Sequence, residues 1–144
     1  AVAIEPDNAL AALNLADVKA LRGDARGAEE LYLRILTLLE RDPGAGHWQL
    51  LSARAQALAH LGRRREAVDT AQQVLQLARD NAQALQEVSL VYVLVGDETS
   101  ALANAERALA EGVEPVWFDL PWYAPLRALP EFQQALARRR SAAA

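Results

Sequence analysis

A short pattern of glycine and alanine occurs three times in this chain and restricts what the chain can fold into. An alanine stands five residues after each of three glycines, in the pairs Gly23 and Ala28, Gly62 and Ala67, and Gly96 and Ala101. One helical turn further on stand Tyr32, Ala71 and Ala105. Self-similarity at a period of about 20–50 residues is typical of repeat architectures, in which each unit stacks on the next. We therefore expect a stack of similar units.

The composition and the hydrophobic spacing predict that these units are helical. Much of the 52% hydrophobic content is alanine, the best helix former, and the chain has only seven glycines. Two stretches place apolar residues at helical spacing: Leu10, Leu13, Val18 and Leu21 in the first, and Leu31, Ile35, Leu38 and Leu39 in the second. Asp24 and Asp97 follow glycines and suit helix N-caps. The predicted fold class is all-α, with six helices paired antiparallel.

The repeated layout resembles the tetratricopeptide repeat (TPR), a helix–turn–helix unit of about 34 residues. The resemblance implies a single-domain α-solenoid over residues 1–144, with units at 9–47, 48–81 and 82–115. Residues 1–8 would be the end of a preceding unit, closed by Pro6, so the chain is expected to be a fragment or a mature form. The sequence departs from the pattern where Ala12, Leu51 and Leu85 replace an early aromatic residue and where Arg54 replaces a leucine. The extra residues of the first unit, around "ERDPGAG", are interpreted as a longer second helix followed by a Pro43–Gly44 turn.

The resemblance also implies an inner groove, lined by the first helix of each unit, that holds a peptide or a partner protein. Carried over by position, its candidate residues are Leu10, Leu13, Asn14, Asp17, Gln49, Ser52, Gln56, His60, Gln83, Gln86, Glu87 and Leu90. None of these is lysine or arginine, so a clamp for a peptide's C-terminal carboxylate is not expected. The alternative is that some of these residues simply face water. The expected function is non-catalytic protein–protein interaction.

The segment 116–144 breaks the repeat pattern and contains most of the aromatic residues, including Trp117, Phe118, Trp122, Tyr123 and Phe132. We interpret it as an aromatic linker and a capping helix that begins at Pro130 and covers the end of the solenoid. That helix should lie along the second helix of the third unit, with Phe132 and Leu136 inward and Arg138 to Arg140 outward. A ligand pocket built from tryptophans is the alternative interpretation.

This segment is similar to the ends of TPR regions in large bacterial signalling proteins such as kinases and cyclases. Two alternatives to a peptide-binding module follow. The chain could be a regulatory region that binds its own catalytic domain, or an oligomerisation module that self-associates through residues 1–6. The abundance of alanine, arginine, glycine and proline is typical of GC-rich bacterial genes.

Candidate catalytic and metal-binding residues are few, and an enzyme is not expected. His47 and His60 match no H-E-x-x-H motif and are interpreted as surface histidines near the two ends of one helix. No serine stands in a G-x-S-x-G motif, and no glycine-rich phosphate loop occurs. Cysteine is absent, which excludes thiolate metal sites and leaves the compartment undecided. No cofactor is therefore expected.

Charge and hydropathy exclude two further classes of partner. The formal net charge is −4, so a broad nucleic-acid-binding surface is not expected. No apolar run approaches 18 residues, so no membrane span is expected. Arg63 to Arg65 are interpreted as a solvated turn whose arginines pair with Glu66 and Asp69, with a phosphate-binding patch as the alternative.

Overall fold

The computed structural model describes residues 6–41 and 47–143, and these residues form helices and no strand. The long helices are α1 (Pro6–Leu21), α2 (Ala25–Arg41), α3 (Trp48–His60), α4 (Arg64–Leu77), α5 (Ala82–Val95), α6 (Glu98–Ala110) and α8 (Pro130–Ala143). Between α6 and α8 lie two 3-10 helices, η1 (Pro115–Asp119) and η2 (Pro121–Tyr123), and the short helix α7 (Ala124–Arg127). The all-α fold class is confirmed. None of the described helices combines the length and the apolar character needed to cross a bilayer.

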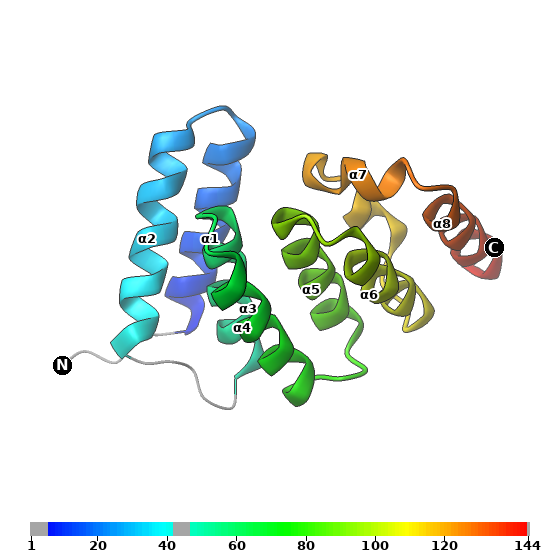
Figure 1. Cartoon of the computed structure of the whole chain (residues 1–144), viewed down its shortest axis with the longest axis horizontal. Helices are drawn as coiled ribbons and strands as arrows, with labels where there is room; N and C mark the ends of the chain where they lie inside the picture. The colour runs from blue at the N-terminus through cyan, green and yellow to red at the C-terminus, as the bar shows by residue number, and fades with distance from the viewer. Residues whose placement is uncertain (1–5, 42–46, 144) are drawn as a thin grey trace.

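The first six helices form three consecutive pairs that follow one another along the long axis of the molecule (Figure 1). Within the pairs α1 packs on α2, α3 on α4, and α5 on α6. Between the pairs, α3 contacts both α1 and α5, so the first helices of all three pairs are neighbours. This arrangement is compatible with a helical repeat.

The bounds of the first pair differ in part from the expected ones. Helix α1 begins at Pro6, three residues before the predicted start of the first unit at Ala9. Helix α2 has 17 residues, against 14 in α4 and 13 in α6, so the longer second helix is confirmed. The predicted end of a preceding unit falls mostly on residues 1–5, and the predicted Pro43–Gly44 turn falls on 42–46. Both lie outside the described residues.

The repeated glycines end the first helix of each pair. Gly96 closes α5 with φ +85°, a left-handed conformation that is strained for residues with a Cβ. Asp97 then starts α6, and its carboxylate accepts a hydrogen bond from the Ser100 backbone N–H at 3.1 Å. Asp24 similarly accepts from the Gly27 N–H at 2.9 Å, so both predicted N-caps are confirmed.

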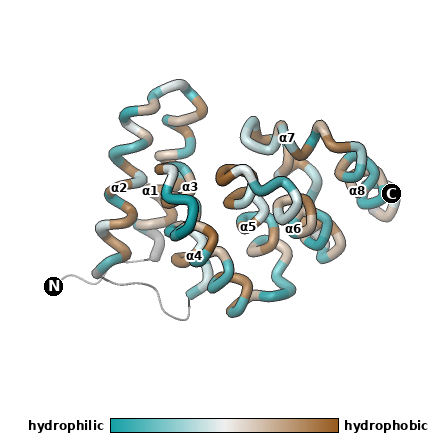
Figure 2. The backbone as a smooth tube through the Cα atoms, in the orientation of Figure 1, coloured by the Kyte–Doolittle hydropathy of each residue, from teal (hydrophilic) through white to brown (hydrophobic). Residues whose placement is uncertain are grey.

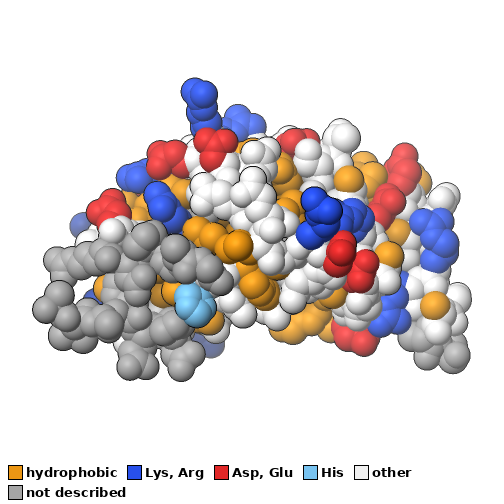
Figure 3. Space-filling model, turned by 90° about the horizontal axis from the view of Figure 1, so that it is seen from below, with side chains coloured by type: hydrophobic (Ala, Val, Ile, Leu, Met, Phe, Trp, Pro, Cys, Tyr) orange, Lys and Arg blue, Asp and Glu red, His pale blue; other side chains and the backbone are white. Residues whose placement is uncertain are grey.

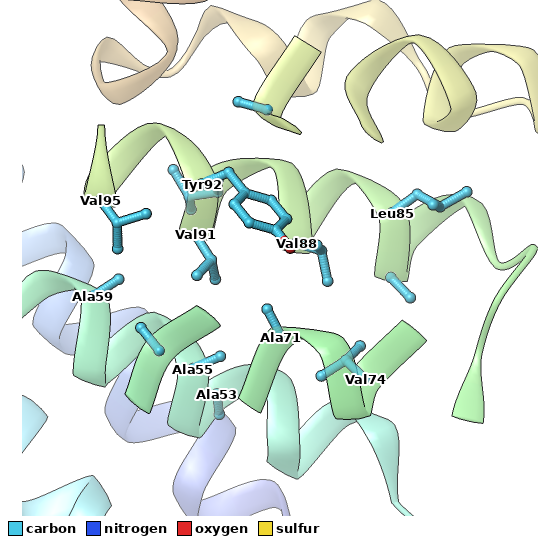
Figure 4. Packing of buried hydrophobic residues seen from close by; sticks show 14 of the residues in the cluster. Ala53, Ala55, Ala59, Ala71, Val74, Leu85, Val88, Val91, Tyr92 and Val95 are labelled. Atoms are coloured by element: carbon cyan, nitrogen blue, oxygen red, sulfur yellow. The ribbon is translucent and has the colours of Figure 1, made fainter. Parts of the chain in front are cut away.

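The repeated alanines are buried, and Ala67 and Ala101 are fully buried as predicted. Small side chains allow helices to approach closely without leaving voids. Figure 4 shows a similar packing between pairs, where valines of α5, including Val88 and Val91, face Ala71 of α4 and alanines of α3. Hydrophobic and hydrophilic residues alternate along the helices, as expected for amphipathic elements (Figure 2).

The buried face of α1 is not the one expected from leucine and valine spacing. Val18 and Leu21 are exposed, whereas Ala9, Leu13 and Ala16 are buried. These three positions follow the i, i+4, i+7 spacing of one helical face, and Val18 and Leu21 lie off it. The prediction was wrong for these two residues because it gave no weight to alanine as a core residue.

The C-terminal segment packs on the third pair. Phe118, Tyr123 and Phe132 are fully buried, and the Phe118 ring meets the other two edge-on, with ring centroids 5.0 Å and 5.1 Å apart. Pro121 and Pro125 limit the linker to short helices, and the last helix begins at Pro130 as predicted. Because α8 packs on α6 with Phe132 and Leu136 buried, the predicted position of the last helix is confirmed.

One detail of this segment differs from the prediction. Arg139 does not point fully outward, because its guanidinium donates to the Gly112 carbonyl at 3.2 Å and pairs with Glu114 at 3.5 Å. Arg138 and Arg140 are exposed, as predicted. Trp117 is 55% exposed and does not join the aromatic cluster that anchors the cap.

Candidate functional site

A groove of about 450 Å³ lies between the first helices of the pairs and the linker that follows α6. Its wall is formed by Leu10, Leu13, Asn14 and Asp17 of α1, Gln56 of α3, Gln83, Gln86, Glu87 and Leu90 of α5, and Val113, Trp117, Leu120 and Trp122 of the C-terminal segment. All three helix pairs therefore contribute to one surface.

The structure brings most, but not all, of the predicted groove residues together. Leu10, Leu13, Asn14, Asp17, Gln56, Gln83, Gln86, Glu87 and Leu90 line the groove, whereas Gln49, Ser52 and His60 do not. Gln49 is exposed near the start of α3. Ser52 is buried beneath Glu87, and His60 is enclosed by aromatic rings. The position of a residue in the repeat identifies its helix, but it does not specify which side of that helix lines the groove.

Glu87 is held by a polar network on the floor of the groove. Its Oε1 atom accepts hydrogen bonds from the Ser52 hydroxyl at 2.7 Å and from the Gln56 amide at 3.1 Å. Gln56 also donates to the Ser52 oxygen at 3.0 Å. Burial raises the pKa of Glu87, although these hydrogen bonds act in the opposite direction. Two side chains of α3 thereby fix the orientation of one carboxylate on α5.

Gln86 joins the groove to the C-terminal segment. Its side-chain nitrogen donates to the Tyr123 hydroxyl oxygen at 2.6 Å, and that hydroxyl donates to the Gln86 backbone carbonyl at 2.9 Å. Both residues are buried. Nearby, the Arg127 guanidinium donates to the Phe118 and Leu120 carbonyls, each at 2.7 Å, which holds the linker that carries Trp117 and Trp122.

His60 was expected at the surface, and that prediction is wrong. Its imidazole stacks on the Tyr32 ring at 4.4 Å between centroids and meets the Trp122 ring edge-on at 4.8 Å, which leaves its side chain 8% exposed. The neighbours come from α2 and η2, so only the tertiary fold encloses the histidine. Burial lowers its pKa to about 4, and His60 is therefore neutral at pH 7.

Asp17 lies beside this histidine at the wall of the groove. The Tyr32 hydroxyl donates to Asp17 Oδ1 at 2.6 Å, and His60 Nε2 lies 3.7 Å from the same oxygen, too far for a hydrogen bond. Burial raises the pKa of Asp17 to about 6, although the Tyr32 hydrogen bond lowers it. The carboxylate is thus ionised at pH 7 next to a neutral imidazole.

Four groove residues were missed when the groove was assigned by position: Val113, Trp117, Leu120 and Trp122. Trp117, Leu120 and Trp122 belong to the segment 116–144, which was interpreted as linker and cap, whereas Val113 belongs to the predicted third unit. The density of aromatic residues in the segment 116–144 was the sequence signal for these positions. The alternative interpretation, a pocket built from tryptophans, was based on that signal. In the structure Phe118 and Tyr123 are buried in the core and the two tryptophans line the groove.

The arginine turn before α4 also differs from its interpretation. Among the described residues, no ion pair joins Arg63, Arg64 or Arg65 to Glu66 or Asp69. Instead, the Arg64 guanidinium donates to the Val95 carbonyl at the end of α5, where backbone acceptors lack helical partners. His47 stands at the N-cap of α3 and is exposed, as predicted.

The described residues contain no candidate metal centre. Over residues 6–41 and 47–143, no group of three or more histidine, cysteine, aspartate or glutamate side chains is arranged to hold a metal ion. No protein-family model matches this chain, and no curated protein sequence matches it significantly. The groove is the site where the described residues of all three helix pairs and the linker meet.

Proposed function

We propose that this chain is a TPR-type interaction module, without catalytic activity, that binds a peptide or a segment of a partner protein in its groove. The observation that carries the proposal is the composition of the groove wall. Residues from α1, α3 and α5, the first helices of three successive pairs, line one groove of about 450 Å³ together with the linker. A groove that runs across stacked helix pairs is the surface that repeat proteins use for extended ligands.

The chemistry of the wall suits a peptide backbone. Asn14 and Gln83 are exposed in the groove, and each side-chain amide can both donate and accept hydrogen bonds. Leu10, Trp117 and Trp122 add apolar surface next to these amides. Polar groups beside apolar contacts are the usual composition of ligand sites.

Selection from a displayed peptide library, with the full chain as target, tests the proposal. Peptides that bind should lose at least tenfold in affinity for Asn14→Ala and for Gln83→Ala. Both side chains are exposed in the groove, so their removal should leave thermal unfolding unchanged. Gln76→Ala is the matched control, because Gln76 is exposed on α4 and lies outside the groove. If no peptide is enriched, or if the selected peptides bind all three variants alike, the proposal fails.

Self-association is a second candidate function, which the surface of the first pair favours. Leu15, Val18 and Leu21 of α1 and Leu33 of α2 are exposed large hydrophobic side chains. Clustered exposed apolar surface commonly marks an interaction site. The self-association contact expected from the sequence, through residues 1–6, falls almost entirely outside the described residues. Sedimentation at increasing protein concentration tests this candidate, and a Leu15→Asp variant should remain monomeric if α1 forms the contact.

A further inference from the structure

Acidic and aromatic side chains share the wall of the groove, and none of the described lining residues is basic. The lining contains the carboxylates of Asp17 and Glu87 and the indoles of Trp117 and Trp122, with neither lysine nor arginine. On the face shown in Figure 3, by contrast, basic and acidic side chains are interspersed. A cleft lined by charge of one sign concentrates its electric field and attracts ligands of opposite charge.

Neither groove carboxylate has a cationic partner among the described residues. The one basic group within 4 Å of either is His60, 3.7 Å from Asp17, and this imidazole is neutral at pH 7. The hydrogen-bond donors to Glu87 Oε1, Ser52 and Gln56, are also neutral. Partial burial of an unpaired carboxylate is unfavourable, and the raised pKa values of both groups reflect that cost. A bound cation would offset it.

Both carboxylates line the groove, and each contacts a residue of α3. Gln56, which contacts Glu87, and His60, which faces Asp17, are four residues apart on α3. Residues at this spacing are neighbours on one helix face, with Cβ atoms about 5–6 Å apart. The Trp122 ring touches His60 on the same side, and Trp117 offers a largely exposed indole at the groove wall. Indole faces attract cations through their ring electrons.

We propose that the groove selects peptides that carry an arginine or lysine, whose charged side chain enters between the Asp17 and Glu87 carboxylates and lies against Trp117 and Trp122. This inference rests on the proposed peptide-binding function and names the chemistry of the peptide. Selectivity comes from charge pairing in a partly desolvated groove, where a neutral side chain would leave both carboxylates unpaired.

A positional-scanning library of N-acetylated, C-amidated hexapeptides tests the proposal on the full chain. One position is fixed as arginine, lysine, citrulline or glutamate, and the others are randomised. Citrulline reproduces the shape of arginine without its charge. Binding is measured through the fluorescence of the groove tryptophans. The arginine and lysine pools should bind at least tenfold more tightly than the citrulline pool, and the glutamate pool should bind most weakly.

Variants that remove a single charge test whether Asp17 and Glu87 produce the preference for the arginine pool. Asp17→Asn and Glu87→Gln keep the side-chain shape, and each should reduce binding of the arginine pool at least tenfold while reducing binding of the citrulline pool clearly less. Glu131→Gln removes the same charge from an exposed position on α8 and should change neither pool. Circular dichroism of each variant verifies that the fold is retained.

The pH dependence of binding gives a separate readout. Because the pKa of Asp17 is about 6, its carboxylate ionises between pH 5 and pH 7, and binding of the arginine pool should strengthen over this range. Tyr32 from α2 and His60 from α3 are the titratable groups that face Asp17, and His60 stays neutral over this range. The strengthening should be smaller in Asp17→Asn, where Glu87, whose pKa is also raised by burial, is the remaining groove carboxylate.

The outcomes distinguish this inference from the proposed peptide-binding function on which it rests. If all pools bind equally, the charge selectivity is wrong and the peptide-binding function stands. If no pool binds, both fail. If n-butylammonium or N-acetylarginine amide binds as tightly as the arginine pool, the groove takes a small cation and the assignment to a peptide is overturned.

Discussion

Gln86 and Tyr123 exchange two hydrogen bonds across the junction between α5 and the C-terminal linker. The Gln86 amide donates to the Tyr123 hydroxyl oxygen at 2.6 Å, and the hydroxyl donates to the Gln86 carbonyl at 2.9 Å. Both residues are buried, and the two bonds fix the linker against the helix that forms the groove floor. The cap and the groove are therefore one structural unit.

Removal of the Tyr123 hydroxyl should destabilise the protein. In Tyr123→Phe the buried Gln86 amide loses its acceptor, at a cost of about 1–3 kcal/mol. Urea denaturation measures the change. In the background Gln86→Leu, which lacks the amide, the same substitution should cost clearly less. Equal costs in both backgrounds would mean that the pair is not coupled.

Enlarging a repeated alanine should disturb the contact within the third pair. Ala101 is fully buried, so Ala101→Leu should lower the free energy of unfolding by about 1–3 kcal/mol through overpacking. Ala103 is exposed on the same helix, and Ala103→Leu should have little effect. Thermal and urea unfolding of the two variants give the comparison. Similar stability for both would place the helix contact elsewhere.

The two aromatic neighbours in η1 should behave differently. Phe118 is fully buried against Tyr123 and Phe132, so Phe118→Ala should cost about 3–5 kcal/mol and expose the end of the third pair. Trp117 is largely exposed, and Trp117→Ala should leave stability nearly unchanged. Urea unfolding of the two variants gives the two costs. A large loss of stability in the Trp117 variant would contradict the division between core and groove.

Asp17 and His60 should contribute opposite pH dependences to the stability of the folded protein. His60 has a folded pKa of about 4, below its unfolded value of 6.5, so it favours folding more strongly as pH rises through this window. Asp17 has a folded pKa of about 6, above its unfolded value of 3.8, so its contribution to folding is lost as pH rises from about 4 to 6. In the native protein these two slopes oppose each other.

When one of the two groups is removed, the pH dependence of the free energy of unfolding should reflect the other group. Relative to the native protein, Asp17→Asn should lose stability on acidification from pH 6 to 4, by at most about 3 kcal/mol. His60→Gln should instead lose relative stability as pH rises from 4 to 6. Urea unfolding at pH 4, 5, 6 and 7 measures all three proteins. Parallel profiles would show that neither group is shifted by burial.

Features encoded within a short stretch of chain could be predicted from the sequence. The all-α class, the N-caps at Asp24 and Asp97 and the buried Ala67 and Ala101 all depend on residues a few positions apart. Helix geometry relates such residues directly, because each turn brings positions three and four apart onto one face. Pro130 similarly marked the start of the last helix, since proline suits the first helical turn.

The composition of the groove depended on contacts between distant segments. Tyr123 reaches Gln86 across 37 positions, and the linker thereby carries Trp122 onto His60 and both tryptophans into the groove. The hydrophobic periodicity of the sequence does not specify the path of this linker, because prolines divide it into short helices. Its path depends on the surfaces against which it packs. The sequence alone therefore determined the helices and their close contacts, whereas the tertiary structure decided that His60 is buried, that Trp117 is exposed, and that unpaired carboxylates and indoles share one wall.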